Sequence, residues 1–257
     1  MGGHSSWHWL GGRGVAIAAL AASAVLVTAA AVARGGAAAP AAAGTAGGDP
    51  VIAAAGDIAC DPSSGDFAGG NGVAGACRQG ATADLLGSAP LAAVLALGDS
   101  QYESATASGY ARSFDPSWGR YRGLIRPAVG NHEYLTSGAA AYFDYFGGAA
   151  GSRASGYYSH DVGAWHLIAL NSNCSRVGGC GPGSAQERWL RADLAAHPAR
   201  CTLAYWHHPR FSSGPHGSTA SMAPIWTALV EGGADVVLSG HDHDYERFAP
   251  LDAASRP

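Results

Sequence analysis

From Asp49 onward, short apolar runs alternate along the chain with longer segments in which apolar and polar residues are mixed. This alternation is typical of a layered α/β domain, in which helices cover a sheet. Strands are predicted at six apolar runs, over 51–55, 92–97, 124–129, 165–170, 202–206 and 235–238. Helices are predicted between them, over 81–86, 108–121, 139–146, 184–196 and 222–231. The pattern therefore indicates one domain of the α/β class.

The helix predicted over 184–196 has the clearest start signal. Ser184 is followed three residues later by Glu187, which is the spacing of a capping box at a helix N-terminus. The apolar face of this helix consists of Trp189, Leu190 and Leu194. We therefore expect the helix to pack against the sheet through that face.

Residues 157–170 are predicted to form a hairpin rather than a crossover. Strand-like residues at 157–159 and 165–170 are joined through an Asp-Val-Gly sequence at 161–163. His160 and His166 lie at strand positions in this segment, where a hydrogen-bonded packing role is expected.

The first 33 residues have the composition of an export signal. A polar start is followed by an apolar run from Val15 to Ala33, which ends in the small-x-small pattern that a signal peptidase accepts. Because the run approaches the about 20 residues that span a bilayer, an uncleaved membrane anchor is the alternative. Residues 34–49 are rich in Ala, Gly and Pro and are expected to form a linker. The domain then covers 50–257, and a secreted, extracellular location is expected.

The cysteines fit an oxidising compartment. Cys60 with Cys77 would close the Gly-rich loop between them, and Cys174 with Cys180 would close a short one. A bridge from Cys174 or Cys180 to Cys201 is an equally good alternative. Since five is an odd number, at least one cysteine stands outside any internal pairing.

Charge excludes some partners and chemistries. The formal net charge is −4, and the 15 basic residues are all arginine, without a basic cluster. A nucleic acid polymer is therefore not expected as a partner. The lack of lysine also excludes lysine Schiff-base and P-loop chemistry.

Polar residues follow five of the predicted strands at the point where each strand ends. Ligand-binding groups collect beyond the carboxyl ends of strands in α/β sheets, so these residues are candidates for one site. A glycine precedes the first polar residue in four of the five clusters, as expected where the backbone turns sharply. The clusters cover 56–57, 98–102, 130–133, 207–208 and 240–243.

In this order, the clusters resemble the motifs of the calcineurin-like metallophosphoesterases, from about 51 to 248. The motifs read Gly56-Asp57, Gly98-Asp99-Ser100-Gln101-Tyr102, Gly130-Asn131-His132-Glu133, His207 and Gly240-His241-Asp242-His243-Asp244-Tyr245-Glu246-Arg247. The resemblance implies a four-layer α/β/β/α sandwich. Family members normally continue beyond the last motif, so the C-terminal strands are expected to be truncated at Pro257. An unpaired sheet edge and exposed apolar surface are then expected.

Within that family, the chain looks most similar to the purple acid phosphatases. Ala59 stands where other branches have a histidine ligand, two residues after Asp57. Tyr102 follows Asp99 by three residues, at the position of the tyrosinate ligand in that branch. The last motif also continues into the Tyr-Glu-Arg sequence at 245–247, as it does there.

Carried over by position, the resemblance implies two metal ions bridged by Asp99. One ion would be held by Asp57, Asp99, Tyr102 and His243, and the other by Asp99, Asn131, His207 and His241. A phenolate favours Fe(III), whereas the second set suits a divalent ion such as Fe, Zn or Mn. Taken singly, each residue has a structural alternative, since Asp57 and Asp99 could cap strand ends and Tyr102 could be a core residue.

A pair of cations can clamp a phosphate and form a bound hydroxide that attacks it. The catalytic candidates for protonating the leaving oxygen are His132 and His216, with His208 behind them. Substrate binding is expected from Asn131, His132, His208 and His216.

The sequence thus predicts a secreted, metal-dependent phosphatase that hydrolyses small phosphate monoesters. A phosphodiesterase with the same metal site is one alternative. A truncated, non-catalytic metal-binding surface protein is the other. Association with a membrane is expected only if the N-terminal segment stays uncleaved.

Overall fold

The computed structural model describes residues 6–9, 25–28, 49–199 and 201–257, and they form two sheets. The four-stranded sheet has the order β2-β3-β4-β5 and the six-stranded sheet has the order β10-β1-β9-β8-β7-β6. The strands of the first are β2 (Val25–Thr28), β3 (Val51–Ala55), β4 (Leu91–Ala96) and β5 (Ile125–Pro127). Those of the second are β1 (Ser6–Trp9), β6 (Tyr158–Val162), β7 (Trp165–Ala169), β8 (Cys201–Trp206), β9 (Val236–Ser239) and β10 (Glu246–Arg247).

The central strands are apolar on both faces, and their alternation assigns each face to a different core. In β4, Leu95 packs into the cluster between the two sheets, whereas Val94 packs into the cluster under the helices. In β8, Tyr205 likewise faces the other sheet and Ala204 faces the helices on its own side. A strand that is buried on both faces reads as a continuous apolar run, which is why these strands were predictable.

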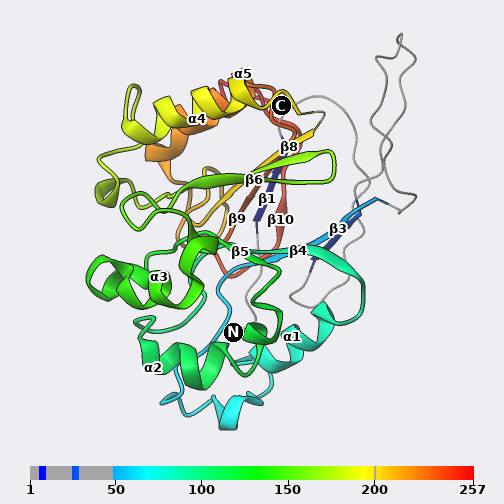
Figure 1. Ribbon diagram of the computed structural model, residues 1–257, viewed down its shortest axis with the longest axis vertical. Helices are drawn as coiled ribbons and strands as arrows, with labels where there is room; N and C mark the ends of the chain where they lie inside the picture. Colours follow the sequence, from blue (N-terminus) through cyan, green and yellow to red (C-terminus); the bar gives the residue numbers. More distant parts are fainter. Residues whose placement is uncertain (1–5, 10–24, 29–48, 200) are drawn as a thin grey trace.

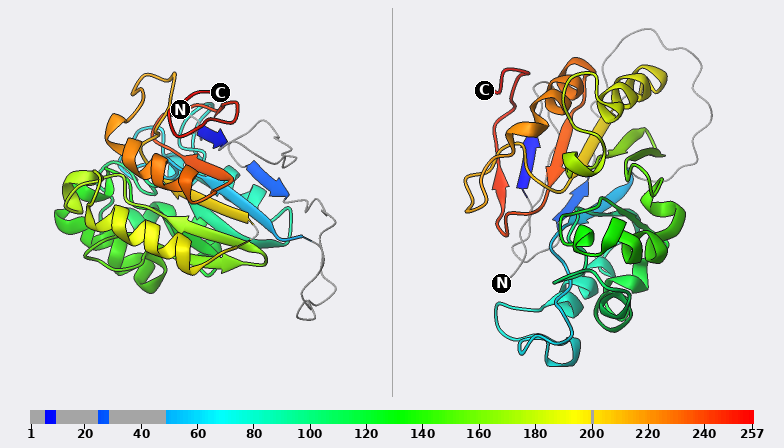
Figure 2. Two further views of the ribbon diagram at one scale, coloured as in Figure 1. Left: turned by 90° about the horizontal axis from the view of Figure 1, so that it is seen from above. Right: turned by 90° about the vertical axis from the view of Figure 1, so that its left-hand side faces the viewer.

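Helices cover the two outer faces of the sheets, which gives four layers. The four-stranded sheet is covered by α1 (Gln79–Leu86), α2 (Ala107–Gly109) and α3 (Ala140–Phe146), and the six-stranded sheet by α4 (Ala185–Ala196) and α5 (Ala223–Glu231). Figure 1 and the right-hand view of Figure 2 show the two groups of helices on opposite sides of the strands. The predicted α/β/β/α arrangement is confirmed.

The helix predicted over 108–121 is wrong as one continuous element. The chain forms the short α2, a π-helical turn over Tyr110–Phe114 and a separate 3-10 helix over Trp118–Tyr121. The backbone leaves the helical region at Ser117, with φ −105° and ψ −95°. Pro116, directly before it, has no N–H to donate to the preceding turn, so a regular helix is interrupted there.

The start of α4 follows the predicted capping pattern, with one difference. The Ser184 hydroxyl accepts a hydrogen bond from the Glu187 N–H at 3.3 Å. The Glu187 carboxylate accepts the N–H of Gly183 at 3.1 Å instead of that of Ser184. Both bonds satisfy amides near the helix start that the helix itself leaves unpaired.

The predicted hairpin is confirmed, because β6 and β7 pair antiparallel with Val162 opposite Trp165. His166 is buried and hydrogen-bonded on both ring nitrogens, to Asp161 at 2.7 Å and to Asp193 at 2.8 Å. The prediction is wrong for His160, whose two ring nitrogens are buried without a hydrogen-bond partner among the described residues. Burial lowers the pKa of His160 to about 4, so the ring stays neutral and stacks on Tyr158.

Among the described residues both sheets are open, with β10 and β6 at the edges of one and β2 and β5 at the edges of the other. β1 pairs antiparallel with β9, β10 lies on its other side, and β2 pairs antiparallel with β3. The expected export signal at 1–33 contains β1 and β2; its other residues, and 34–48 of the expected linker, lie outside the described residues. Among the described residues, no helix has the length and hydropathy to cross a bilayer. The exposed large apolar side chains described are Val73, Leu85, Leu135 and Tyr245.

Two disulfides lie within the domain. Cys60 is bonded to Cys77 and Cys174 to Cys180, whereas Cys201 belongs to neither bond. Each disulfide therefore closes a local loop. This is the local pairing predicted from the sequence, and not the alternative that involved Cys201.

Candidate metal centre

Parallel pairing brings the polar strand ends to one place. β3, β4 and β5 are parallel in one sheet, and β7, β8 and β9 are parallel in the other. The expected ligands Asp57, Asp99 and Asn131 follow strands of the first sheet, and His207 and His241 follow strands of the second. All seven expected ligands come together, and the distances below join them into two groups.

Three of these residues have left-handed backbone angles, with φ of 57° at Asp57, 47° at Asp99 and 76° at His241. Such angles cost about 1–3 kcal/mol each in residues with a side chain, so neighbouring contacts must hold them. The Asp57 N–H donates to Gly98 O at 3.1 Å, and the His241 N–H donates to Asp57 Oδ2 at 2.9 Å. The Asp99 N–H donates to Glu133 Oε2 at 3.0 Å, so each strained residue is held by another segment.

The glycines of the motifs serve close approach more than turning. A Cβ on Gly130 would lie 2.1 Å from Asp99 Oδ1, and a Cβ on Gly240 would lie 2.7 Å from Asp57 Oδ2. Neither glycine has a positive φ, in contrast to Gly98 at 92°. Of the four motif glycines, Gly98 has a left-handed backbone, whereas Gly56, Gly130 and Gly240 do not, and the last two make room for the carboxylates.

The first group of donor atoms surrounds His207. Its Nδ1–H donates to Leu97 O at 3.0 Å, so Nε2 faces the site and can bind an ion once it has lost its own proton. That Nε2 lies 3.0 Å from Asn131 Oδ1, 3.1 Å from Asp99 Oδ2 and 3.2 Å from His241 Nδ1. This is the set expected to hold the divalent ion.

The second group surrounds the Tyr102 hydroxyl. Its oxygen lies 2.7 Å from Asp57 Oδ1, 3.0 Å from His243 Nε2 and 3.4 Å from Asp99 Oδ2. His243 Nε2 is also 3.3 Å from Asp57 Oδ1. Asp99 Oδ2 belongs to both groups, so this carboxylate could be shared by two ions.

These spacings fit metal coordination. Ligands about 2.1 Å from one ion and at right angles to each other lie about 3.0 Å apart. Carboxylate, amide oxygen, imidazole and phenol are donors for Fe, Zn or Mn. The residues present therefore fit the two ions that the family implies.

Burial and the carboxylates of the site shift the pKa values of His207 and Tyr102. Burial by itself lowers the pKa of His207, but the Asp99 carboxylate more than offsets this and raises it to about 9. Burial also raises the pKa of Tyr102 far above its usual range, and the Asp57 and Asp99 carboxylates add to that effect. Only a strongly polarising cation would replace the phenolic proton at such a position.

Glu133 holds the backbone of the site, a role that the motif did not reveal. It is fully buried, and its carboxylate accepts the N–H groups of Asp99, Ser100 and Gly130 at 3.0, 2.8 and 2.7 Å. Burial and the Asp99 charge raise the pKa of Glu133 to about 7. A signal was present in the sequence, since a carboxylate at this place in an apolar fold must be hydrogen-bonded.

Two of the candidate histidines, His132 and His216, line a cavity of about 380 Å3 beside the expected ligands. The His132 ring lies edge-on to Tyr102 at 4.5 Å, and its Nδ1 donates to Glu103 O at 2.5 Å. The His216 ring lies 4.5 Å from that of His241, and its N–H donates to the buried Asp242 carboxylate at 2.8 Å. Asp242 is a second supporting residue that sequence reasoning missed.

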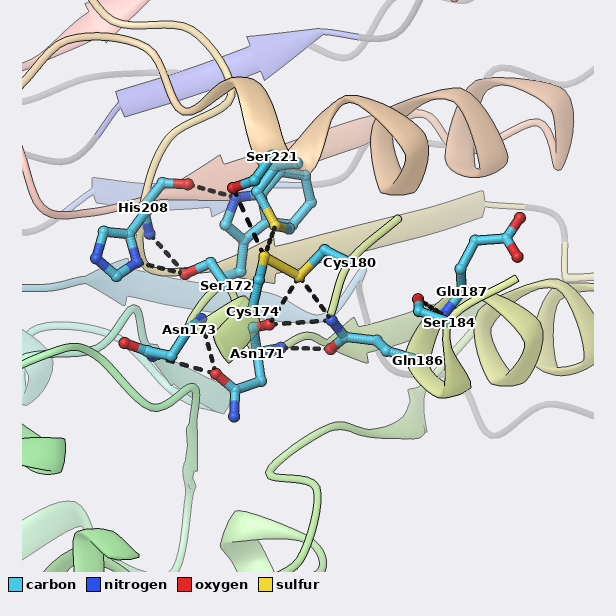
Figure 3. The surroundings of a disulfide bond; sticks show 12 residues. Asn171, Ser172, Asn173, Cys174, Cys180, Ser184, Gln186, Glu187, His208 and Ser221 are labelled. Atoms are coloured by element: carbon cyan, nitrogen blue, oxygen red, sulfur yellow. Dashed lines mark hydrogen bonds between the residues drawn. A yellow bond between two sulfur atoms is a disulfide. The ribbon is translucent and has the colours of Figure 1, made fainter. Parts of the chain in front are cut away.

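His208 lies behind His241 instead of among the residues that line the cavity. Its N–H donates to Ser172 Oγ at 2.9 Å, and the same hydroxyl lies 2.8 Å from its Nδ1 (Figure 3). Burial and the neighbouring rings of His207 and His241 lower the pKa of His208 to about 2. It is therefore a neutral group held in place by Ser172.

The Cys174–Cys180 disulfide supports the same segment. Asn171 exchanges two hydrogen bonds with Gln186 of α4, at 2.8 and 3.0 Å, directly beside the disulfide (Figure 3). Asn173 donates to Val129 O at 3.2 Å, in the segment before Asn131. The loop thus joins α4 to two sides of the site.

Comparison with known families agrees with this geometry. The family model of the calcineurin-like phosphoesterases matches residues 52–245. The chain belongs to this family. A probable purple acid phosphatase of Arabidopsis thaliana, number 20, is 28% identical over 170 residues, covering 54% of this chain and 38% of the relative. Purple acid phosphatase 18 of the same plant is 33% identical over 106 residues, covering 38% and 23%.

A solved structure shows the same fold. A purple acid phosphatase isolated from yellow lupin (Lupinus luteus) seeds superimposes with a TM-score of 0.51 at 16% identity, over 72% of this chain and 36% of that one. The chain spans less than two fifths of the length of these relatives.

Proposed function

We propose that this chain is an exported phosphatase that hydrolyses small phosphate monoesters at a centre of two metal ions. The observation that carries the proposal is the shared position of Asp99 Oδ2, which lies 3.1 Å from His207 Nε2 and 3.4 Å from the Tyr102 hydroxyl. One carboxylate oxygen that faces two separate donor sets is placed to be shared by a pair of ions. Family membership supports the reaction class.

When bound, two cations neutralise the charge of a phosphate and promote the ionisation of water. This chain's residues then have two tasks, to orient the ester and to protonate the oxygen that leaves. His132 and His216 are placed for both, because they line the cavity next to the ligands. Since His132 Nδ1–H donates to Glu103 O, a proton for the leaving oxygen would come from Nε2, on the side of Asp99.

Tyr102 points to Fe(III) as one of the ions. Its hydroxyl lies among two carboxylates and an imidazole, where the phenol holds its proton unless a cation of high charge replaces it. A phenolate is a hard anionic donor and suits a trivalent ion. The second ion is divalent Fe, Zn or Mn.

Export is supported by the two disulfides, which persist in oxidising compartments. It predicts that the protein accumulates outside the cytoplasm with a new N-terminus near Arg34, which N-terminal sequencing of the mature chain would show. An intact N-terminus on membrane-bound protein would favour the anchor instead.

The decisive experiment compares two esters. Purified full chain, supplied with iron and zinc or manganese, should release phosphate from p-nitrophenyl phosphate faster than it cleaves bis(p-nitrophenyl) phosphate. The opposite preference would favour a phosphodiesterase. No turnover of either ester by protein that contains both ions would favour a non-catalytic metal-binding protein.

A further inference from the structure

The described residues 207–219 form the loop that carries His216, and they contain neither a helix nor a strand. The neck of the loop is closed by the Thr219 N–H, which donates to Pro209 O at 2.8 Å, and by the Ser212 N–H, which donates to Ser218 Oγ at 3.1 Å. Neither bond involves His216, which is exposed. An exposed loop of this kind opens easily unless it is tied down, so the place of His216 beside the metal centre depends on other contacts.

Asp242 supplies such contacts from the strand end that also carries two expected ligands. It stands between His241 and His243 in the chain and is fully buried. Its Oδ1 accepts the His216 N–H at 2.8 Å, and its Oδ2 accepts the Ser212 hydroxyl. Both carboxylate oxygens therefore bind the loop. Since a buried carboxylate is stable only with such partners, the carboxylate and the loop hold each other in one arrangement.

Gly214 shows how closely the loop packs on this carboxylate. Its N–H donates to Ser212 Oγ at 2.9 Å, so the same hydroxyl joins the loop backbone to Asp242. A Cβ on Gly214 would lie 2.6 Å from Asp242 Cγ. Gly214 does not have a positive φ, so what the loop requires here is the absence of a side chain.

The position of Asp242 in the chain connects the loop to both groups of donor atoms. His241 Nδ1 lies in the group around His207, and His243 Nε2 lies in the group around Tyr102. The His216 ring lies 4.5 Å from that of His241. A residue that is bonded to both ligands along the chain, and to His216 through its side chain, fixes the distance of His216 from the whole centre.

We propose that Asp242 is a positioning residue, which holds the loop so that His216 faces the phosphate ester at the metal centre. It acts through His216, because it is buried and does not line the cavity. A misplacement of about 1 Å can cost about a hundredfold in rate, so the backbone contact of His216 matters as well as its ring. The inference rests on the proposed function, because His216 is taken to act on the ester.

Hydrogen exchange tests the contact without relying on turnover. In Asp242→Asn an NH2 group replaces one accepting oxygen, so the Ser212 hydroxyl and the His216 N–H compete for the oxygen that remains. In the full chain supplied with iron and zinc, the amides over 212–216 should then exchange about tenfold faster, as expected for the loss of one hydrogen bond to a charged group. Mass spectrometry of peptides from this segment measures the rate.

Gly214→Ala provides a second route to the same result, because it keeps the carboxylate and removes the room for the loop. It should accelerate exchange over 212–216 in the same way, and it decides the matter alone if Asp242→Asn does not fold. Unchanged exchange in either folded variant would overturn the proposal.

A matched control lies at the other end of β9. The Asp235 carboxylate accepts the Thr202 N–H at 2.9 Å, and Asp235→Asn should leave exchange over 212–216 unchanged. Elemental analysis should find about two ions per chain in Asp242→Asn, as in the unchanged protein, since no ligand is altered. Loss of an ion would show that Asp242 holds the ligands instead of the loop, and would overturn the proposal.

Kinetics distinguish a positioning role from a merely structural one. His216→Ala should lower kcat/KM for p-nitrophenyl phosphate by about a hundredfold, and Asp242→Asn by about tenfold. In the His216→Ala background, Asp242→Asn should cost less than about threefold, because the two residues act as one unit. An equal loss in both backgrounds would reject the positioning role.

The same experiments separate this inference from the proposed function. Faster exchange over 212–216 in variants of a protein that releases no phosphate would keep the loop contact and reject the phosphatase. Phosphate release that Asp242→Asn leaves unchanged would keep the phosphatase and reject the positioning role.

Discussion

Two groups of histidine and aspartate among the described residues are each centred on a buried histidine, and they differ in how their atoms are arranged. At the metal centre, His207 Nε2 faces three donor atoms of Asn131, Asp99 and His241 within 3.2 Å. At the hairpin, each nitrogen of His166 has a carboxylate of its own, Asp161 at 2.7 Å and Asp193 at 2.8 Å. The nitrogen and oxygen atoms of the first group converge on one point, whereas those of the second form separate histidine–carboxylate pairs.

The backbone and ring geometry follow the same division. The hairpin group also includes His197, whose ring is stacked on that of His166. The ring centroids are 4.5 Å apart and the ring planes differ by 14°, so the nitrogens of the two rings do not point at one another. The metal centre instead uses left-handed backbone at Asp57, Asp99 and His241 to turn ligands inward. Residue type alone does not distinguish the two groups, since both are close enough to hold an ion. What distinguishes them is that the possible metal-binding atoms of the first group converge on one point.

The largest effect is expected from Asp99→Asn. Asparagine keeps the shape but removes the bridging charge, so both ions should be lost or misplaced. We expect phosphatase activity to fall by about a thousandfold or more, comparable to the loss of one preorganised charge-stabilising group. Steady-state kinetics on p-nitrophenyl phosphate would show it. Activity within tenfold of the unchanged protein would mean that Asp99 is not the bridge.

The hairpin group should respond in stability and not in metal content. His166→Ala leaves the buried Asp193 carboxylate without one of its partners, which should lower the free energy of unfolding by about 3 kcal/mol. Denaturant unfolding measures this loss, and elemental analysis should find the metal content unchanged. Loss of metal in this variant would show that the two groups are alike after all.

Tyr102→Phe should act on one ion only. Loss of an outer-shell partner typically costs 10–100-fold in metal affinity or activity, and loss of a direct ligand should cost at least that. The visible phenolate-to-iron absorption should also disappear. Tyr145→Phe is the control, because the Tyr145 hydroxyl donates to Asp115 and not to a residue of the site, and this variant should keep the colour. Unchanged absorbance in Tyr102→Phe would reject the tyrosine ligand.

The smallest expected effect is a pH dependence at the hairpin. Burial lowers the pKa of His166, but hydrogen bonds to Asp161 and Asp193 outweigh it, so the pKa is raised in the folded protein. The contribution of protonated His166 to stability is therefore complete below about pH 6.5, which is the pKa of histidine in the unfolded chain. It is lost as the pH rises through the higher pKa that His166 has in the folded protein. Unfolding measured between pH 6 and 9 should show this decline, and His166→Ala should lack it.

Much of the fold followed from the sequence because the strands are buried on both sides. The runs at 51–55 and 202–206 agree with β3 and β8 to within one residue. The pairing of β1 with β9 was not predicted, since no local pattern at 6–9 specifies a partner more than two hundred residues away. Pro116 indicates a break in the helix predicted over 108–121, but the helical pattern on either side of it led to the prediction of one continuous helix.

At the site, motif order identified the residues that meet, but their support depends on contacts between distant segments. The bonds from Glu133 to Asp99 and Ser100 join residues more than thirty positions apart. The left-handed backbone of Asp57 and the close approach of Gly240 to its carboxylate were not predicted, because both arise where distant segments meet in the folded structure.

The most direct test of the two-ion centre is the metal content of the purified full chain. We predict about two ions per chain, iron among them, with a single ion remaining in His243→Ala because His243 belongs only to the Tyr102 group. His166→Ala should keep both ions. A chain that holds no ion above the buffer level, or that loses ions with His166 and not with His243, would contradict the central claim.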